Sequence, residues 1–145
     1  MKISTKGRYA LRMLLDLAEH QNDGYIALKD IAKRQEISKK YLEQIIPILN
    51  KSDILNANRG YQGGYRLAKE PSKYTVGDIL RLTEGSLSPV ACLDHKPIEC
   101  ERSADCMTLP VWKGLDKVIN EYLDSITLQE ISDMQREKYA NDYVI

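Results

Sequence analysis

The sequence predicts a mainly α-helical fold with one small β-hairpin and a long C-terminal helix. Apolar residues recur with helical spacing over the first 50 residues, a glycine-rich segment follows them, and a second long helical pattern begins at Pro110. With 145 residues, the chain has room for one compact core and an appended arm. Its sequence has no stretch close to the roughly 20 apolar residues that a bilayer crossing needs, so no membrane partner is expected.

Three helices are expected before residue 52. The first runs from Thr5 to about Glu19, the second has two turns, and the third begins after Ser38, whose hydroxyl suits a helix N-cap. Their apolar faces comprise Ala10, Leu14, Leu17 and Ala18 in the first, Leu28, Ile31 and Ala32 in the second, and Leu42, Ile45, Ile46 and Leu49 in the third. A short helix, a tight turn and a longer helix are typical of a helix-turn-helix.

A β-hairpin is expected next, in residues 54–67. Two short strand patterns flank a tip that contains Gly60, Gly63 and Gly64, with Arg59 and Arg66 on either side. Glycine permits positive φ and lets backbone N–H groups approach a phosphate closely. Because this hairpin directly follows the helix-turn-helix, we interpret it as a wing, and we predict that residues 1–74 form a winged helix-turn-helix DNA-binding domain.

The charge distribution agrees with a polyanion as partner of the first half. The formal net charge is zero, but residues 1–70 carry 13 basic and 8 acidic side chains, and residues 71–145 carry 8 and 13. An excess of this size is common on solvated faces, so the positions of the charges matter more than their sum.

The candidate DNA-binding residues lie at the start of the third helix and in the wing. Lysine can meet guanine or phosphate, Gln44 can read adenine, and Glu43 can accept from cytosine or exclude other bases. The full set is Ser38, Lys39, Lys40, Glu43, Gln44, Arg59, Gly60, Gly63, Gly64 and Tyr65. The alternative is that these are solvated residues of a protein-interaction module that does not bind DNA.

Residues 75–135 are predicted to hold a cysteine loop and dimerisation helices. Thr75 and Asp78 suit a capping box for a helix that ends at Gly85. In the long helix that starts at Pro110, apolar residues alternate at spacings of three and four, as in a dimer interface. They are Trp112, Leu115, Ile119, Tyr122 and Ile126. Thr127 and Glu130 cap a last short helix, and residues 136–145 are expected to form a mobile C-terminal tail.

Several segments resemble one family of bacterial regulators. The run from Lys2 to Leu11, the segment Tyr41–Gln44, the wing Arg59–Leu67, and Asp78-Ile79 before Glu84-Gly85 are similar to the IscR/NsrR/CymR family of transcriptional regulators. The resemblance implies a homodimer that places two winged domains on one palindromic operator of double-stranded DNA. It also implies that the long C-terminal helix joins the two subunits.

Three cysteines, Cys92, Cys100 and Cys106, fall in the aperiodic segment 86–109. Thiols that stay reduced suit a metal or an iron-sulfur cluster, but zinc, a thiol-disulfide sensor and structural cysteines are alternatives. Family members with three cysteines here bind a cluster, commonly 2Fe-2S, and the resemblance implies the same cofactor. The first gap is longer than the family's, and Leu109 stands near where a His ligand is sought. As fourth ligand, His95, Glu99, Asp105 and a residue of the partner subunit stay open.

The last four residues, Asp142, Tyr143, Val144 and Ile145, resemble the tail by which serine acetyltransferases dock into cysteine synthase. CymR-type members of the family form a complex with that enzyme, which makes cysteine synthase a second expected partner.

No enzymatic activity is expected, because no nucleophile, base and orienting group form a recognisable pattern. The N-terminal sequence lacks a secretory signal, so the expected place is the cytoplasm. The expected function is repression of genes for cysteine and sulfur metabolism or iron-sulfur cluster assembly.

Overall fold

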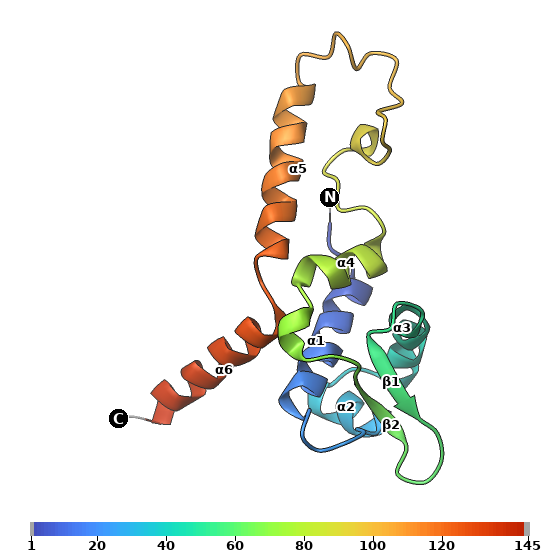
Figure 1. The fold of residues 1–145 in the computed structure, drawn as a ribbon, viewed down its shortest axis with the longest axis vertical. Coiled ribbons are helices and arrows are strands. Elements are labelled where there is room, and N and C mark those ends of the chain that lie inside the picture. Colours follow the sequence, from blue (N-terminus) through green and yellow to red (C-terminus); the bar gives the residue numbers. More distant parts are fainter. Residues whose placement is uncertain (1, 144–145) are drawn as a thin grey trace.

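The computed structural model describes residues 2–143 and contains the predicted helices and hairpin (Figure 1). The helices are α1 (Thr5–Glu19), α2 (Leu28–Gln35), α3 (Lys39–Lys51), α4 (Val76–Glu84), α5 (Leu109–Asp124) and α6 (Leu128–Tyr143). The strands β1 (Leu55–Asn58) and β2 (Gly64–Leu67) form an antiparallel pair, with Leu55 opposite Leu67 and Asn58 opposite Gly64. This architecture confirms the predicted fold class.

Local capping explains where the helices begin. The hydroxyl of Ser4 accepts a hydrogen bond from the Gly7 amide, and the hydroxyl of Ser38 accepts one from the Tyr41 amide. Thr75 and Asp78 form the predicted reciprocal capping box of α4. Each of these bonds satisfies an amide that has no partner within its own helix, which favours a helix start at that residue.

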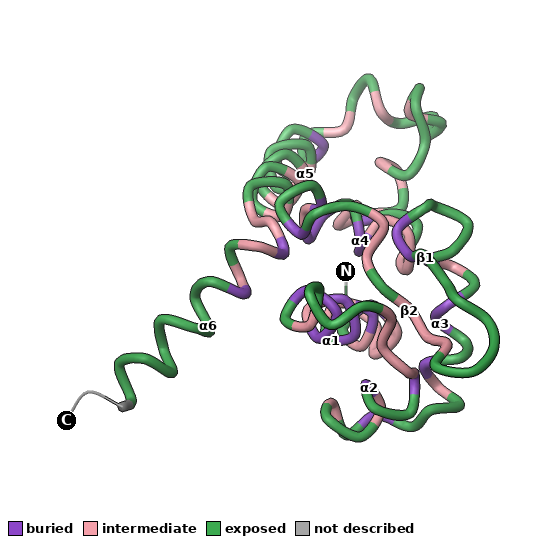
Figure 2. Tube along the Cα trace, turned by 60° about the horizontal axis from the view of Figure 1, so that its bottom comes forward, coloured by how far each residue is buried: buried purple, intermediate pink, exposed green. Residues whose placement is uncertain are grey.

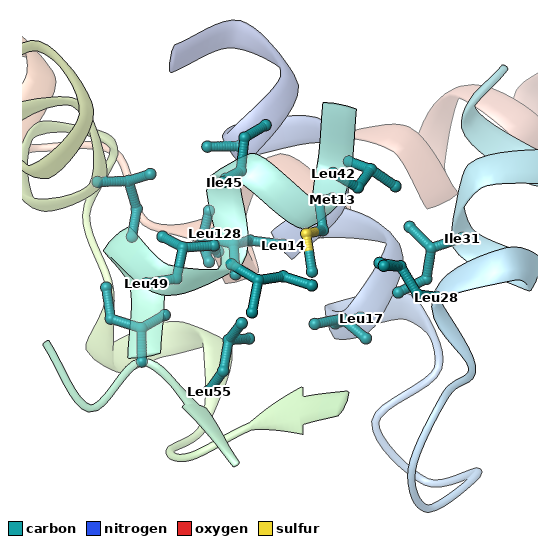
Figure 3. Close-up of a cluster of buried hydrophobic side chains, with 14 of the residues drawn as sticks. Met13, Leu14, Leu17, Leu28, Ile31, Leu42, Ile45, Leu49, Leu55 and Leu128 are labelled. Carbon is teal, nitrogen blue, oxygen red and sulfur yellow. The ribbon is translucent and has the colours of Figure 1, made fainter. Parts of the chain in front are cut away.

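The main core lies between α1, α2 and α3. Their buried side chains point toward one another in Figure 3, and α4 and α6 complete the cluster with Ile79 and Leu128, which are fully buried. The labelled core side chains are Met13, Leu14, Leu17, Leu28, Ile31, Leu42, Ile45, Leu49, Leu55 and Leu128. Helix α4 packs on α1 and shares this core, so we use "winged domain" for α1 to α4 together with the hairpin.

The hairpin is fixed to the helices of the winged domain through its backbone. Ile26 and Tyr65 exchange two hydrogen bonds of 2.8 Å, which extends the two-stranded sheet by an isolated bridge. At Gly64 a Cβ atom would overlap the Ile26 carbonyl oxygen and would lie 2.8 Å from the Ala27 amide nitrogen. Glycine is therefore needed at this position because two backbone segments approach each other closely.

The proposed role of positive φ is wrong for two of the three wing glycines. Gly60 has a φ of 110°, but Gly63 and Gly64 do not have positive φ, and the non-glycine residue Gln62 does, at 60°. A Cβ at Gly63 would lie 2.8 Å from the Gly60 carbonyl oxygen. Close packing, not backbone freedom, thus accounts for glycine at positions 63 and 64.

Helices α5 and α6 extend away from the winged domain (Figure 1), and most of their residues are exposed (Figure 2). The prediction of a short last helix is wrong, because α6 continues through Tyr143 and includes most of the predicted tail. Residues 144–145, the last two residues of that tail, lie outside the described residues. Among residues 2–143, no helix is long and apolar enough to span a membrane.

Candidate nucleic-acid interface

Helix α3 presents one buried face and one exposed polar face. Leu42, Ile45, Ile46 and Leu49 are buried in the core. The opposite side carries Ser38, Lys39, Lys40, Glu43 and Gln44, all of which are exposed. Lys39 Nζ lies 3.9 Å from Glu43 Oε1, an i, i+4 pair in which both side chains remain more than half exposed. The predicted recognition residues are therefore free to meet a partner.

A groove of about 440 Å³ separates α3 from the wing. Its walls bring together seven of the predicted residues: Lys39, Glu43, Arg59, Gly60, Gly63, Gly64 and Tyr65. Ser38, Lys40 and Gln44 lie on the exposed side of α3 outside this groove. Six other residues line the groove, and the three polar ones among them, Lys29, Asn50 and Asn58, are not among the predicted binding residues. Lys29 could not be found from periodicity, because only tertiary packing brings the start of α2 beside the wing.

The charge of this groove favours an anionic ligand. Lys29, Lys39 and Arg59 contribute cations, and Glu43 contributes one carboxylate that is already near Lys39. The side chains of Asn50 and Asn58 add neutral hydrogen-bond donors. Lysine, arginine, amide side chains and backbone N–H groups are the usual donors to nucleic-acid phosphates.

The wing tip exposes an aromatic side chain that the sequence analysis does not single out. Tyr61 is 96% exposed, between Gly60 and the positive-φ residue Gln62. The Gly63 amide closes the tip by donating to the Gly60 carbonyl over 2.9 Å. Tyr65, by contrast, packs partly against the core, so its side chain supports the wing as well as lining the groove.

A buried carboxylate holds α2 against α1 and so orients the helix-turn-helix. Asp16, only 3% exposed, accepts bonds of 2.7 and 3.0 Å from Arg34 and one of 3.0 Å from the Gln35 amide. The hydrogen bond to Asp16 raises the pKa of Arg34. Because both Arg34 and Gln35 donate hydrogen bonds to it, the carboxylate can remain charged in the interior.

Aromatic packing fixes the other side of the helix-turn-helix. The rings of Tyr9 and Tyr41 meet edge to face, with centroids 5.3 Å apart, and the Arg12 guanidinium lies 5.3 Å from the centre of the Tyr9 ring. These contacts tie the start of α3 to α1. The packing of α3 against α1 therefore fixes the direction in which the exposed face of α3 points.

The three cysteines lie in the irregular segment between α4 and α5. Cys92 and Cys106 are partly exposed, Cys100 is exposed, and all three are free thiols. Within the described part of the chain, no three Cys, His, Asp or Glu side chains converge as a metal-binding group, so this conformation of the segment does not fit a cluster bound to all three thiols. The Thr108 hydroxyl, 3.4 Å from the sulfur, lowers the pKa of Cys106, and nearby backbone amides act in the same direction.

Helix α5 carries an exposed apolar stripe. The stripe consists of Val111, Leu115, Val118 and Tyr122, at spacings of four, three and four residues. Leu115 and Tyr122 belong to the predicted interface, whereas Trp112 and Ile119 are partly buried beside the stripe. Ile126 is not on this helix: it follows the end of α5 and packs on the second apolar cluster, with Val76, Leu80 and Leu87. Including Ile126 in the α5 stripe is therefore wrong.

The fold and the exposed α3 face define a winged helix-turn-helix regulator of the DNA-binding class. Residues 3–134 match the Rrf2 family model, described as an iron-dependent transcriptional regulator. The chain belongs to the Rrf2 family of transcriptional regulators.

Relatives and solved structures cover nearly the whole chain. Protein rrf2 of Nitratidesulfovibrio vulgaris is 39% identical over 131 residues, which are 90% of this chain and 87% of that protein. The regulator CymR of Bacillus subtilis is 38% identical over 96% of this chain and 97% of its own. The CymR structure, described as that of the global cysteine regulator of B. subtilis, has a TM-score of 0.76 over 92% of this chain and 98% of its own. The IscR structure of T. potens has the same TM-score at 41% identity, over 95% of this chain and 90% of its own.

Proposed function

We propose that this protein is a cytoplasmic homodimeric repressor that reads a palindromic operator. The observation that carries the proposal is the exposed polar face of α3 beside a cationic groove and a wing. A helix of this kind fits the major groove, where base edges can be read, while the wing reaches the adjacent backbone. A dimer doubles the contact and requires a symmetric site.

The apolar stripe of α5 supports the homodimer. Four large apolar side chains stand exposed on one face of a helix that leaves the winged domain, which is unfavourable in water. Their spacing of four, three and four residues suits the packing of two helices side by side. A second copy of α5 is the occupant that we propose for this stripe, because two-fold symmetric pairing is the commonest way in which identical chains associate.

Two substitutions test the assignment of the DNA-binding residues. We expect Arg59→Ala to weaken binding to operator and random DNA alike, and to reduce the slope of log K against log salt by about 1, because it removes one phosphate contact. Gln44→Ala should instead relax the preference among operator variants, since a base-edge contact contributes about 1–3 kcal/mol of discrimination. Fluorescence titrations on both DNAs at several salt concentrations measure the two effects. Unchanged titrations for both variants would disprove this placement of the interface.

The cysteine segment is the proposed sensor, with an iron-sulfur cluster of the 2Fe-2S type as its cofactor. Support comes from three thiols in one irregular segment next to α5 and from the iron-dependent description of the family model. Binding through Cys92, Cys100 and Cys106 requires residues 86–108 to rearrange, because the three thiols do not lie together in the described conformation. A zinc site or a thiol switch would use the same residues.

Iron and sulfide analysis of anaerobically purified protein tests the sensor. We expect iron and sulfide in the wild type and neither in Cys92→Ala, Cys100→Ala or Cys106→Ala, because losing one thiolate leaves iron open to solvent. Ser103→Ala, in the same segment, is the matched control and should keep both elements. If wild-type protein made with iron available contained zinc or no metal, the cluster assignment would be wrong. The sensor would then be a zinc site or a thiol-redox switch.

Cysteine synthase is the proposed protein partner, bound through Asp142, Tyr143, Val144 and Ile145. Similarity to a regulator described as the global cysteine regulator supports a role in cysteine metabolism. The segment Asp142–Ile145 would occupy a site for an amino-acid substrate, so O-acetylserine should compete. Calorimetry with a peptide of residues 136–145, and with the same peptide lacking Ile145, measures this. Equal heats from both peptides would remove cysteine synthase from the partners.

A further inference from the structure

An arginine on α4 holds the dimerisation helix at three points. Arg81 Nη1 donates to Asp124 Oδ1, and Nη2 donates to Asp124 Oδ2 and to Asn120 Oδ1, each over 2.8 Å. The bidentate bond to the carboxylate fixes direction as well as distance. It also raises the pKa of Arg81. We call Arg81, Asn120 and Asp124 the α4–α5 clamp.

The surrounding chain is built around this clamp. A Cβ atom at Gly77 would overlap Asp124 Oδ1, so glycine leaves the room that the carboxylate occupies. The Asn120 side chain is itself held, because its amide donates to the Asp116 carbonyl over 2.8 Å. At the start of α4, next to Gly77, the Val76 amide donates to the Ile126 carbonyl over 2.9 Å, which holds the chain just after the end of α5.

Between its ends, α5 has no fully buried apolar side chain, and Trp112 and Ile119 are only partly buried. Leu109 is buried at its start and Leu123 packs on the second apolar cluster near its end. Between them, a gap of about 350 Å³ lies between α4 and α5, lined by Arg81, Asp116 and Asn120 and by residues 85–88, 93, 94 and 96. Because side chains do not fill this gap, the angle between the two helices depends strongly on the clamp.

We propose that Arg81 is the positioning residue that fixes α5 relative to the winged domain and thereby sets the distance between the two DNA-reading surfaces of the dimer. This inference rests on the proposed dimer and deepens it. Helix α4 moves with α1 through their shared core, whereas α5 carries the apolar stripe for the partner. If the angle between α4 and α5 is fixed, the distance between the two recognition helices of the dimer is fixed as well. The dimer then binds half-sites of one spacing on the operator.

Binding to operators of altered spacing separates this role from general structural support. Each added base pair rotates one half-site by about 35° and moves it by about 3.4 Å. We expect the wild type to lose about tenfold or more in affinity when two base pairs are inserted at the centre, and Arg81→Met to lose less than about threefold. Asp124→Asn, which weakens the clamp from the α5 side, should also reduce the dependence of operator affinity on half-site spacing. Arg81→Lys should keep part of that dependence, because lysine retains one charged contact to Asp124.

Matched measurements decide between the possible outcomes. Affinity for a single half-site and the dimer mass in sedimentation should be the same for wild type and Arg81→Met, and small-angle scattering should show a broader distribution of shapes for the variant. An unchanged spacing profile in Arg81→Met would overturn the inference, as would an equal loss on the single half-site, which would indicate damage to the winged domain. Failure of the wild type to bind any operator would contradict the proposed function itself.

Discussion

Val118→Asp is expected to leave the protein monomeric at micromolar concentration and to lower its operator affinity by about 100-fold or more. The Val118 side chain is 62% exposed in the single chain, so an aspartate there is hydrated and the winged domain should fold normally. In a dimer the carboxylate would be buried against the partner's apolar stripe without a counter-ion, which is strongly unfavourable. Sedimentation velocity and an operator titration measure the two effects.

The control for this variant is Lys117→Asp, one residue earlier on α5. Lys117 points away from the stripe and its Nζ lies 3.7 Å from Glu121 Oε1, on an exposed polar side of the helix. It changes the charge by more than Val118→Asp does, yet it should leave the dimer intact. A Val118→Asp protein that sediments as a dimer would show that the interface lies elsewhere.

Gly64→Ala is expected to loosen the wing from the segment Ile26–Ala27 before α2. The added Cβ overlaps the Ile26 carbonyl oxygen, so the two hydrogen bonds between Ile26 and Tyr65 must lengthen or break. Overpacking of this kind lowers the unfolding free energy by about 1–3 kcal/mol. Operator affinity should fall by about tenfold or more, because losing one contact of about 1.4 kcal/mol already gives that factor.

Gly114→Ala is the matched control, because a Cβ at Gly114 in α5 meets nothing within 4 Å in the single chain. In a helix this substitution should raise the unfolding free energy by about 0.5–1 kcal/mol. Urea unfolding at one fixed protein concentration compares the two variants. Equal stabilities of Gly64→Ala and the wild type would mean that the wing is not fixed through this close backbone contact.

The fold could be predicted because its signals are local. Ser38 and Thr75 stand at helix starts and cap them, and the apolar residues of α1 to α3 repeat with the helical period. The length of α6 could be predicted in part, since Arg136, Lys138 and Ala140 are strong helix formers, but the polar composition of residues 136–145 indicates a tail. The inward-facing positions Leu128, Ile131 and Ser132 all lie near its start.

The site could be predicted only in part, because its remaining features depend on packing. Lys29 reaches the groove through the placement of α2, and the Arg81 clamp joins residues 43 positions apart. Two adjacent apolar stripes run along α5, one with Val111 and Val118 and the other with Trp112 and Ile119. Their spacing alone does not show which stripe faces outward. Contacts of Leu109 and Leu123 within the chain decide that Val111 and Val118 face outward, while Trp112 and Ile119 turn partly inward.

Selection of bound sequences from a random duplex DNA library tests the central claim most directly. The proposed function predicts that the wild-type protein enriches one inverted repeat, with half-sites about one helical turn or a multiple of it apart. It also predicts that binding to this repeat weakens steeply as salt is raised. Recovery of no preferred sequence, or of a sequence without two-fold symmetry, would contradict a homodimer that reads a palindromic operator through α3 and the wing.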